Sequence, residues 1–184
     1  MKFHRDYRLR LSETEDGRFK MTISVGDRLP EATLFRFGPD GPEAVQLSMQ
    51  LKGRKVALFA VPGAFTPTCS QQHIPGFIQN ADALRAQGMD EIICVSVNDP
   101  FVINAWAAQT GADRAGIMLL GDPSAEFTKA IGMLFSLAEK GLHDRSSRYS
   151  MLVEDGVVKI LNKEESPGIC TITAGGELLA QLSG

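Results

Sequence analysis

The three cysteines, Cys69, Cys94 and Cys170, are the residues of this chain best suited to chemistry. Their spacings of 25 and 76 residues match no zinc-ligand pattern, and the chain has no C-x-x-C pair. An odd number at this low density is atypical of a disulfide-stapled secreted fold. We therefore expect no metal and no cofactor, and either inert core cysteines or a reactive thiol.

Cys69 stands in a segment that favours a reactive thiol, VPGAFTPTCSQQH over residues 61–73. Thr66 followed by Pro67 predicts a helix start, with Thr66 as the N-cap and Pro67 at the first helical position. Cys69 then occupies about the third helical position, where unpaired N–H groups and the helix dipole favour the nucleophilic thiolate. The alternative is that the pair only starts a helix and Cys69 only packs.

Strands and helices must position this segment. Two short apolar runs, residues 55–61 and 91–97, predict buried strands of a sheet covered on both faces. A helix is expected between them, with a kink near Pro75 and a C-terminal cap at Gly88. Its apolar face has helical spacing: Ile74, Phe77, Ile78, Ala81 and Leu84.

Further local signals complete the pattern. Asp-Pro pairs predict two more helix starts, a turn pair predicts a hairpin within residues 148–162, and the last residues predict a helix over 175–182. These signals are Asp99-Pro100, Asp122-Pro123 with a helix end near Gly132, and Asp155-Gly156. The order predicts an α/β domain with a central mixed sheet flanked by helices. We expect Trp106 to pack in the core and the charged run 163–165 to be a solvated loop.

Residues 1–20 are charged and lack periodicity, and Met21 resembles a natural protein start. We expect an N-terminal extension over 1–20, disordered or loosely attached, and a domain over 21–184. The alternative is an extra hairpin, in which apolar residues alternate with polar ones: Phe3, Tyr7 and Leu9.

The net charge, the apolar runs and the first residues limit which partners and which location we expect. The net charge of -3 over 184 residues does not favour a nucleic-acid partner. No apolar run approaches the ~20 residues that span a bilayer. The first residues lack the apolar stretch of a signal peptide. We expect no nucleic acid, no membrane and a cytoplasmic location.

A wider pattern around Cys69 points to a family. Pro62, Thr66 and Cys69 form P-x-x-x-T-x-x-C, which resembles the active-site signature of the peroxiredoxins. The string PGAFTPTCSQQHIPGF is similar to the subfamily that contains mammalian peroxiredoxin five and the type II peroxiredoxins. The resemblance continues through EIICVSVNDPFVINAW and RSSRYSMLVEDGVVKILN, from about Val25 to the C-terminus. It implies a thioredoxin-like fold, a homodimer, and reduction of hydrogen peroxide or alkyl hydroperoxides.

The resemblance also implies roles for site residues. Cys69 matches the peroxidatic cysteine, which attacks peroxide and becomes a sulfenic acid. Thr66 matches a hydroxyl that hydrogen-bonds in the pocket, and Pro62 a proline that shields the thiolate from water. Arg148 matches a strand arginine that holds the thiolate and donates to peroxide.

Two neighbouring residues are weaker candidates. Arg145 lies three positions before Arg148. His73, four residues after Cys69, matches a histidine common in the subfamily. It could tune the site or contact a reductant, and capping or packing remains equally open.

The sulfenic acid must be reduced again, and three routes are open. Cys94 matches the second cysteine of type II peroxiredoxins, yet its strand looks buried, so an inert thiol is an equal alternative. Cys170 lies about two residues from the position expected for a resolving cysteine. In the third route, which we favour, glutathione or glutaredoxin attacks directly; thioredoxin is another possible reductant.

The leading hypothesis is thus a thiol-dependent peroxidase acting on hydroperoxides. A thioredoxin-like disulfide oxidoreductase is a second hypothesis, against which the missing C-x-x-C counts. A non-catalytic binding or chaperone module is a third. The intact set of proline, threonine, cysteine and arginine argues against that module, since binding does not need these residues together.

Overall fold

The computed structural model describes residues 11–13 and 19–183. The hairpin suggested near the N-terminus depends on residues outside these ranges: Phe3, Tyr7 and Leu9. Strands β1 (Leu11–Glu13) and β2 (Phe19–Met21) form an antiparallel, two-stranded sheet of their own. This sheet includes Met21, the residue at which the sequence suggested that the domain starts.

A seven-stranded mixed sheet forms the centre of the domain, in the order β11-β10-β5-β6-β7-β3-β4. Strands β5, β6 and β7 are parallel, and the other neighbours pair antiparallel. The strands are β3 (Thr33–Gly38), β4 (Gly41–Gln46), β5 (Lys55–Val61), β6 (Glu91–Ser96), β7 (Met118–Gly121), β10 (Tyr149–Glu154) and β11 (Val157–Lys163). The predicted mixed sheet is confirmed.

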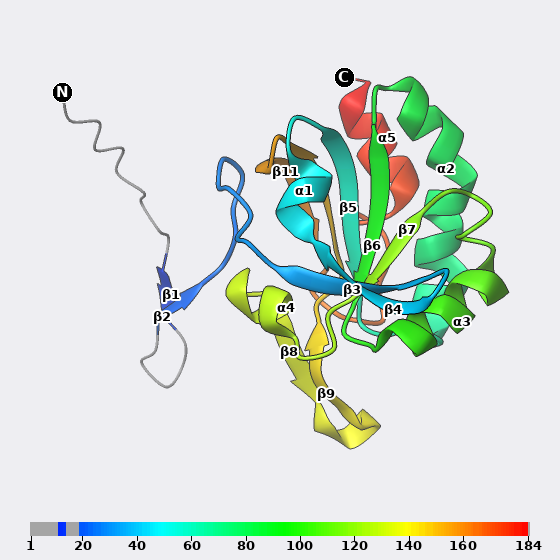
Figure 1. Cartoon of the computed structure of the whole chain (residues 1–184). Coiled ribbons are helices and arrows are strands. Elements are labelled where there is room, and N and C mark those ends of the chain that lie inside the picture. The colour runs from blue at the N-terminus through cyan, green and yellow to red at the C-terminus, as the bar shows by residue number, and fades with distance from the viewer. Residues whose placement is uncertain (1–10, 14–18, 184) are drawn as a thin grey trace.

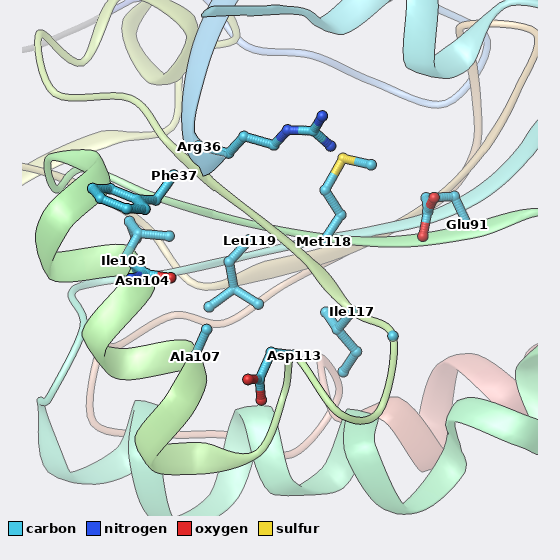
Figure 2. Close-up of a pocket in the computed structure, with 11 residues that line it drawn as sticks. Arg36, Phe37, Glu91, Ile103, Asn104, Ala107, Asp113, Ile117, Met118 and Leu119 are labelled. Carbon is cyan, nitrogen blue, oxygen red and sulfur yellow. The ribbon is translucent and has the colours of Figure 1, made fainter. Parts of the chain in front are cut away.

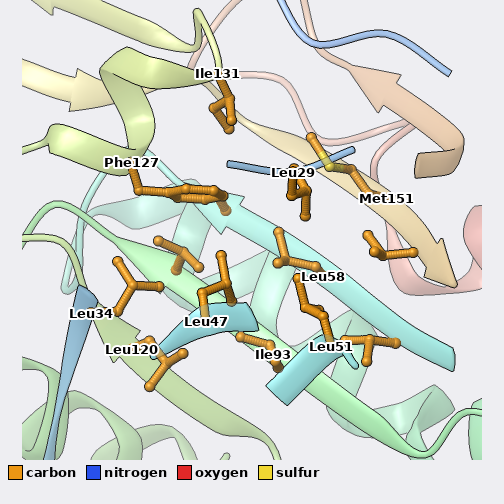
Figure 3. Close-up of a cluster of buried hydrophobic side chains, with 14 of the residues drawn as sticks. Leu29, Leu34, Leu47, Leu51, Leu58, Ile93, Leu120, Phe127, Ile131 and Met151 are labelled. Atoms are coloured by element: carbon orange, nitrogen blue, oxygen red, sulfur yellow. The ribbon is translucent and has the colours of Figure 1, made fainter. Parts of the chain in front are cut away.

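Helices cover both faces of this sheet (Figure 1). They are α1 (Leu47–Leu51), α2 (Ile74–Ala86), α3 (Pro100–Thr110), α4 (Glu126–Ala130) and α5 (Gly175–Leu182). Alternate residues of β5 face opposite ways, as the strand pleat requires. Phe59 packs with α2, α3 and α5, whereas Leu58 packs with α1 and α4 in the core shown in Figure 3. No helix among the described residues is long and apolar enough to cross a membrane.

Most local predictions are confirmed. Strands β5 and β6 coincide with the predicted apolar runs to within one residue, and α5 has the predicted bounds. The Asp99 carboxylate accepts from two N–H groups of α3, at 2.9 and 3.0 Å. Gly88 follows α2 with a φ of 85°. Asp155 and Gly156 both have positive φ, 47° and 76°, as a type I′ turn requires.

The helix start at Asp122-Pro123 is wrong in position. Helix α4 begins only at Glu126, because Ala125 takes the left-handed conformation with a φ of 55°. Asp122 nevertheless caps the helix from a distance: its carboxylate accepts from the Thr128 N–H at 2.8 Å. The cap residue was thus identified, but the intervening turn was not.

A hairpin that the sequence did not predict extends from the domain beside α4 (Figure 1). Strand β8 (Leu134–Leu137) and β9 (Leu142–Ser146) pair antiparallel, joined by a 3-10 turn, η2 (Ala138–Lys140). This hairpin carries Arg145 and contributes one wall of the cavity described below.

Candidate active site

A strained turn connects β5 to the helix that carries Cys69. Phe65 has a φ of 63°, a conformation that is unfavourable for a bulky side chain. Asn98, which follows β6, holds the turn: its Oδ1 accepts from the Ala64 N–H at 3.0 Å and from the Ser96 hydroxyl at 2.7 Å. The parallel pairing of β5 and β6 brings these residues to the same edge of the sheet.

The helical turn begins at Pro67, as predicted, and the Ser70 N–H donates to the Thr66 carbonyl at 3.0 Å. The Thr66 hydroxyl donates to the Gly63 carbonyl at 2.8 Å. This differs from the expected cap, in which that hydroxyl accepts from a helix N–H. Thr66 therefore closes the turn before the helix.

Cys69 is the third helical residue and the first of a π-helical turn, η1 (Cys69–His73). The Ile74 N–H bonds to the Cys69 carbonyl, five residues back. Pro75 follows at once and has no N–H for the regular helix ladder. The irregularity expected near Pro75 is thus present as a π-helical turn, a feature often found at functional sites.

Arg148 reaches the sulfur from a distant part of the chain. Its Nη2 lies 3.3 Å from Cys69 Sγ, although the residues are 79 positions apart. Strand β10 starts directly after Arg148 and pairs antiparallel with β5, so its start lies beside the end of β5. Both Arg148 and Cys69 are buried. Arg145 instead donates to the Val97 carbonyl at 2.8 Å.

His73 is buried and neutral beside Arg148. Its Nε2 lies 3.0 Å from the Thr173 carbonyl and so carries the proton, leaving Nδ1 to accept from Arg148 Nη1 at 2.9 Å. Phe59 and Phe77 pack edge-on against the ring. Burial, and then the Arg148 charge, lower the pKa of His73 from 6.5 to about 3, although the Thr173 bond opposes this. The Arg148 guanidinium is therefore the cation of this pair at neutral pH.

The neutral, buried His73 predicts a loss of stability in acid. Below pH 6.5 the unfolded chain protonates this histidine, whereas the folded chain resists protonation down to about pH 3. Protons therefore favour unfolding across this window. We expect His73 to account for about 3 kcal/mol of the loss in unfolding free energy between pH 7 and pH 4. Denaturant unfolding of His73→Gln at both pH values measures it.

The exposed His143 supplies the matched control for this measurement. His143→Gln should keep the wild-type difference between the two pH values, whereas His73→Gln should reduce it by about 3 kcal/mol. An unchanged difference in His73→Gln would contradict the account of a neutral, buried ring.

The loop between β11 and α5, residues 164–174, covers this side of the site. The Pro167 carbonyl accepts from Arg148 Nη2 at 2.8 Å. At the far end of the loop, a Cβ on Gly175 would lie 2.8 Å from the Gly76 carbonyl oxygen. Glycine therefore allows α5 to begin against α2, close to His73.

The prediction of a solvated run over 163–165 is wrong for Glu164, which is only 6% exposed. Its carboxylate accepts from the Thr171 N–H at 2.6 Å and the Thr173 N–H at 3.1 Å. These inward N–H groups replace water around the charge. Lys163 and Glu165 are exposed, as expected.

The other two cysteines differ in environment, and all three are free thiols. Cys94 lies buried in β6. Burial, and next the proximity of Cys69, raise its thiol pKa well above the ordinary value, although Arg148 opposes this. Cys170 lies half-buried in the 164–174 loop, and burial is the main cause of its raised pKa. Neither thiol is activated as a thiolate in this conformation.

Two cavities of the fold differ in their relation to the predicted site residues. One, of about 330 Å³, borders the Cys69 helix and is lined by Pro62, Thr66, Pro67, Thr68, Leu137, Lys140, Leu142, Pro167 and Gly168. The other, of about 300 Å³, lies between α3 and β7 and includes Arg36, Phe37 and Asp113 (Figure 2). It is lined by none of the predicted site residues, whereas the first is lined by Pro62 and Thr66 and is the candidate for substrate entry. A further cavity, of about 260 Å³, is lined by Arg148, Glu164 and Pro167, among others.

The structure thus gathers Cys69, His73 and Arg148 into hydrogen-bonding contact, with Thr66 and Pro62 on the adjacent cavity wall. Sequence reasoning missed the contributions of the 164–174 loop. The contacts of this loop with Arg148 and His73 are made by backbone carbonyl groups, which every residue type carries, so no side-chain motif could have identified them. Phe65 was missed because a positive φ is unexpected for phenylalanine.

Comparisons with known proteins find similarity over most of the chain. A family model described as Redoxin matches residues 24–175. Peroxiredoxin-2E-2, chloroplastic, of Oryza sativa subsp. japonica is 52% identical, with 88% of this chain and 73% of that protein covered. Peroxiredoxin-2C of the same organism is 45% identical, with 87% and 98% covered. The solved structure of reduced Prx3 in complex with H2O2 from Vibrio vulnificus has a TM-score of 0.82 at 43% identity, with 88% and 99% covered.

Proposed function

The chain belongs to the Redoxin family and is a thiol-dependent peroxidase of the peroxiredoxin type with a thioredoxin-like fold, and we propose that its reaction runs through Cys69. The observation that carries this proposal is the 3.3 Å contact between Arg148 Nη2 and Cys69 Sγ. A guanidinium donor at a buried sulfur stabilises the thiolate, which is the nucleophilic form.

In the proposed first step, the Cys69 thiolate attacks the terminal oxygen of a hydroperoxide. A sulfur–oxygen bond forms, the oxygen–oxygen bond breaks, and the leaving oxygen takes a proton from solvent to become water or an alcohol. Arg148 has five N–H groups, three of which have partners in the described part of the chain. We propose that the remaining donors, which include the buried Nε with no partner among the described residues, bind the peroxide oxygens in the transition state.

We assign supporting roles to Thr66 and Pro62, which border the 330 Å³ cavity. The Thr66 hydroxyl bond to Gly63 fixes the turn that presents Cys69. Pro62 adds an apolar, donor-free surface that limits water at the thiolate. The buried His73 supports Arg148 through its Nδ1 and is not placed to contact a reductant.

Reduction of the Cys69 sulfenic acid is proposed to use an external thiol, either glutathione or glutaredoxin, with thioredoxin as the other candidate. The raised thiol pKa values of Cys94 and Cys170 support this route, because a protonated thiol attacks slowly. Two external thiols are consumed, giving one disulfide and one water for each sulfenic acid reduced.

Mass spectrometry after one equivalent of peroxide tests the proposed route. We expect the reduced protein to carry one added oxygen on Cys69, to form no internal disulfide, and to lose that oxygen only when an external thiol is supplied. A Cys69–Cys170 or Cys69–Cys94 disulfide formed without added thiol would contradict the external route and identify the resolving cysteine.

We also propose a homodimer whose contact surrounds the site. Large apolar side chains are exposed on the two loops beside Cys69: Phe65 at 49%, Ile169 at 44% and Ile172 at 49%. Light scattering of wild type and of Phe65→Glu tests the contact. A cytoplasmic location is proposed separately; two of the relatives are named as chloroplastic, so the alternative is an organelle. Cell fractionation tests it.

The activity itself is tested by hydrogen peroxide and alkyl hydroperoxide consumption, with glutathione plus glutaredoxin or with thioredoxin. Consumption of peroxide with either system is the expected result. Reduction of a protein disulfide without peroxide turnover would favour a disulfide oxidoreductase. Neither activity would favour a non-catalytic module.

A further inference from the structure

The 164–174 loop supplies both site side chains with a backbone acceptor. The Pro167 carbonyl accepts from Arg148 at 2.8 Å, and the Thr173 carbonyl accepts from His73 at 3.0 Å. An irregular loop has no repeating backbone hydrogen bonds to orient its carbonyl groups. Other contacts must therefore keep this loop in the conformation that presents both acceptors.

Glu164 ties together the two ends of that loop. Its backbone N–H donates to the Arg148 carbonyl at 3.0 Å, which fixes the start of the loop to the arginine's own backbone. Its Oε1 accepts from the N–H of Thr171 at 2.6 Å, and from the N–H and hydroxyl of Thr173 at 3.1 Å each. Bonds from both threonines to a charged acceptor are stronger than bonds to a neutral one.

Three further contacts connect Thr173 to the Cys69 sulfur. With its N–H and hydroxyl bound to Glu164, Thr173 offers its carbonyl to His73 Nε2. That bond keeps the proton on Nε2, so Nδ1 remains an acceptor for Arg148 Nη1 at 2.9 Å. Arg148 is then oriented with Nη2 on Cys69. Were the proton on Nδ1, two N–H donors would face each other.

We propose that Glu164 is a positioning residue for the peroxidase reaction, holding Thr173 so that His73 keeps its Nε2–H tautomer and orients Arg148 on Cys69. The inference deepens the proposed function and rests on it, since it concerns the same sulfur. Burial raises the pKa of Glu164, but the bonds from Thr171 and Thr173 lower it further, so the net pKa is below the ordinary value. The group is therefore an anion at neutral pH.

The test compares Glu164→Gln with Glu165→Gln in the full chain. The two variants make the same chemical change on adjacent residues, one buried and one exposed. Gln keeps the shape of Glu164 but loses the charge-assisted bonds. The rate with hydrogen peroxide can be followed by the fluorescence of Trp106, the single tryptophan, whose Nε1 donates to the Ser70 hydroxyl beside Cys69. Ring nitrogen NMR shifts of His73 report its tautomer.

Glu164→Gln should react about 10- to 100-fold more slowly with peroxide, because a misplaced arginine loses alignment with the reacting atoms. The His73 shifts should move from a pure Nε2–H tautomer toward a mixture. Glu165→Gln should match wild type in both readouts. A rate within twofold of wild type in Glu164→Gln would overturn the proposal. So would a slower rate with an unchanged tautomer, because Glu164 would then only support the loop.

Two further measurements keep the outcome interpretable. If Glu164→Gln does not fold, Thr173→Val removes the hydroxyl bond to Glu164, together with a 3.9 Å contact to Cys170 Sγ, and leaves the Thr173 backbone in place. It should shift the tautomer and slow the reaction in the same direction. If wild type does not react with peroxide at all, the proposed function fails. The His73 tautomer and the alkylation rate of Cys69 by iodoacetamide then still decide whether Glu164 positions the pair.

Discussion

Replacing Cys69 with serine is expected to abolish peroxide reduction while leaving the fold intact. Serine keeps a small side chain that can accept from Arg148 at the buried position. An alcohol, however, does not ionise at neutral pH and is a far weaker nucleophile toward peroxide oxygen than a thiolate. Peroxide consumption with the external thiol system should fall to background, and trapping of sulfenic acid on the protein should disappear.

The matched control for this variant is Cys170→Ser, which changes a half-buried thiol in the neighbouring loop. It should still form sulfenic acid on Cys69 at the wild-type rate, because Cys170 takes no part in the first step. Circular dichroism and thermal unfolding of both variants establish that the fold persists. Turnover by Cys69→Ser above a trace would end the assignment of Cys69 as the reacting residue.

Arg148→Lys should slow the reaction with peroxide by about 100- to 1,000-fold, the range for losing a well-placed donor in an active site. The guanidinium bonds Cys69, His73 and the Pro167 carbonyl at once, through two nitrogens in a fixed plane. A lysine offers one nitrogen on a flexible stem and cannot reproduce that arrangement. Its charge still favours the thiolate, so alkylation of Cys69 by iodoacetamide should decline much less.

Comparing the two rates separates the two functions of the arginine. A loss of peroxide rate far larger than the loss of alkylation rate supports binding of peroxide in the transition state. Equal, small losses of the peroxide rate and the alkylation rate would indicate that Arg148 acts only through its positive charge. Arg145→Lys is the matched control and should change neither rate, since Arg145 bonds the Val97 carbonyl instead of the sulfur.

Local order was predictable because its causes lie within a few residues of one another. Apolar periodicity identified β5, β6 and α2, and the Asp155-Gly156 pair identified the turn before β11. The Thr66-Pro67 pair predicted the helical turn that begins at Pro67 and carries Cys69. Each feature depends on backbone preferences or on side-chain spacing, which the sequence states directly.

Contacts between distant segments required the tertiary structure. Residue spacing could not show that Arg148, rather than Arg145, meets the sulfur; the pairing of β10 with β5 decides this. Nor could it reveal the buried charge of Glu164, because the charged run 163–165 resembles a solvated loop. Its burial depends on N–H groups that the folded loop turns toward it. The sequence by itself identified Cys69 as the candidate reactive residue, predicted its helix and, through the family resemblance, named Arg148 as its partner. Only the tertiary structure showed that His73, Thr173 and Glu164 support that arginine, because these contacts join distant segments.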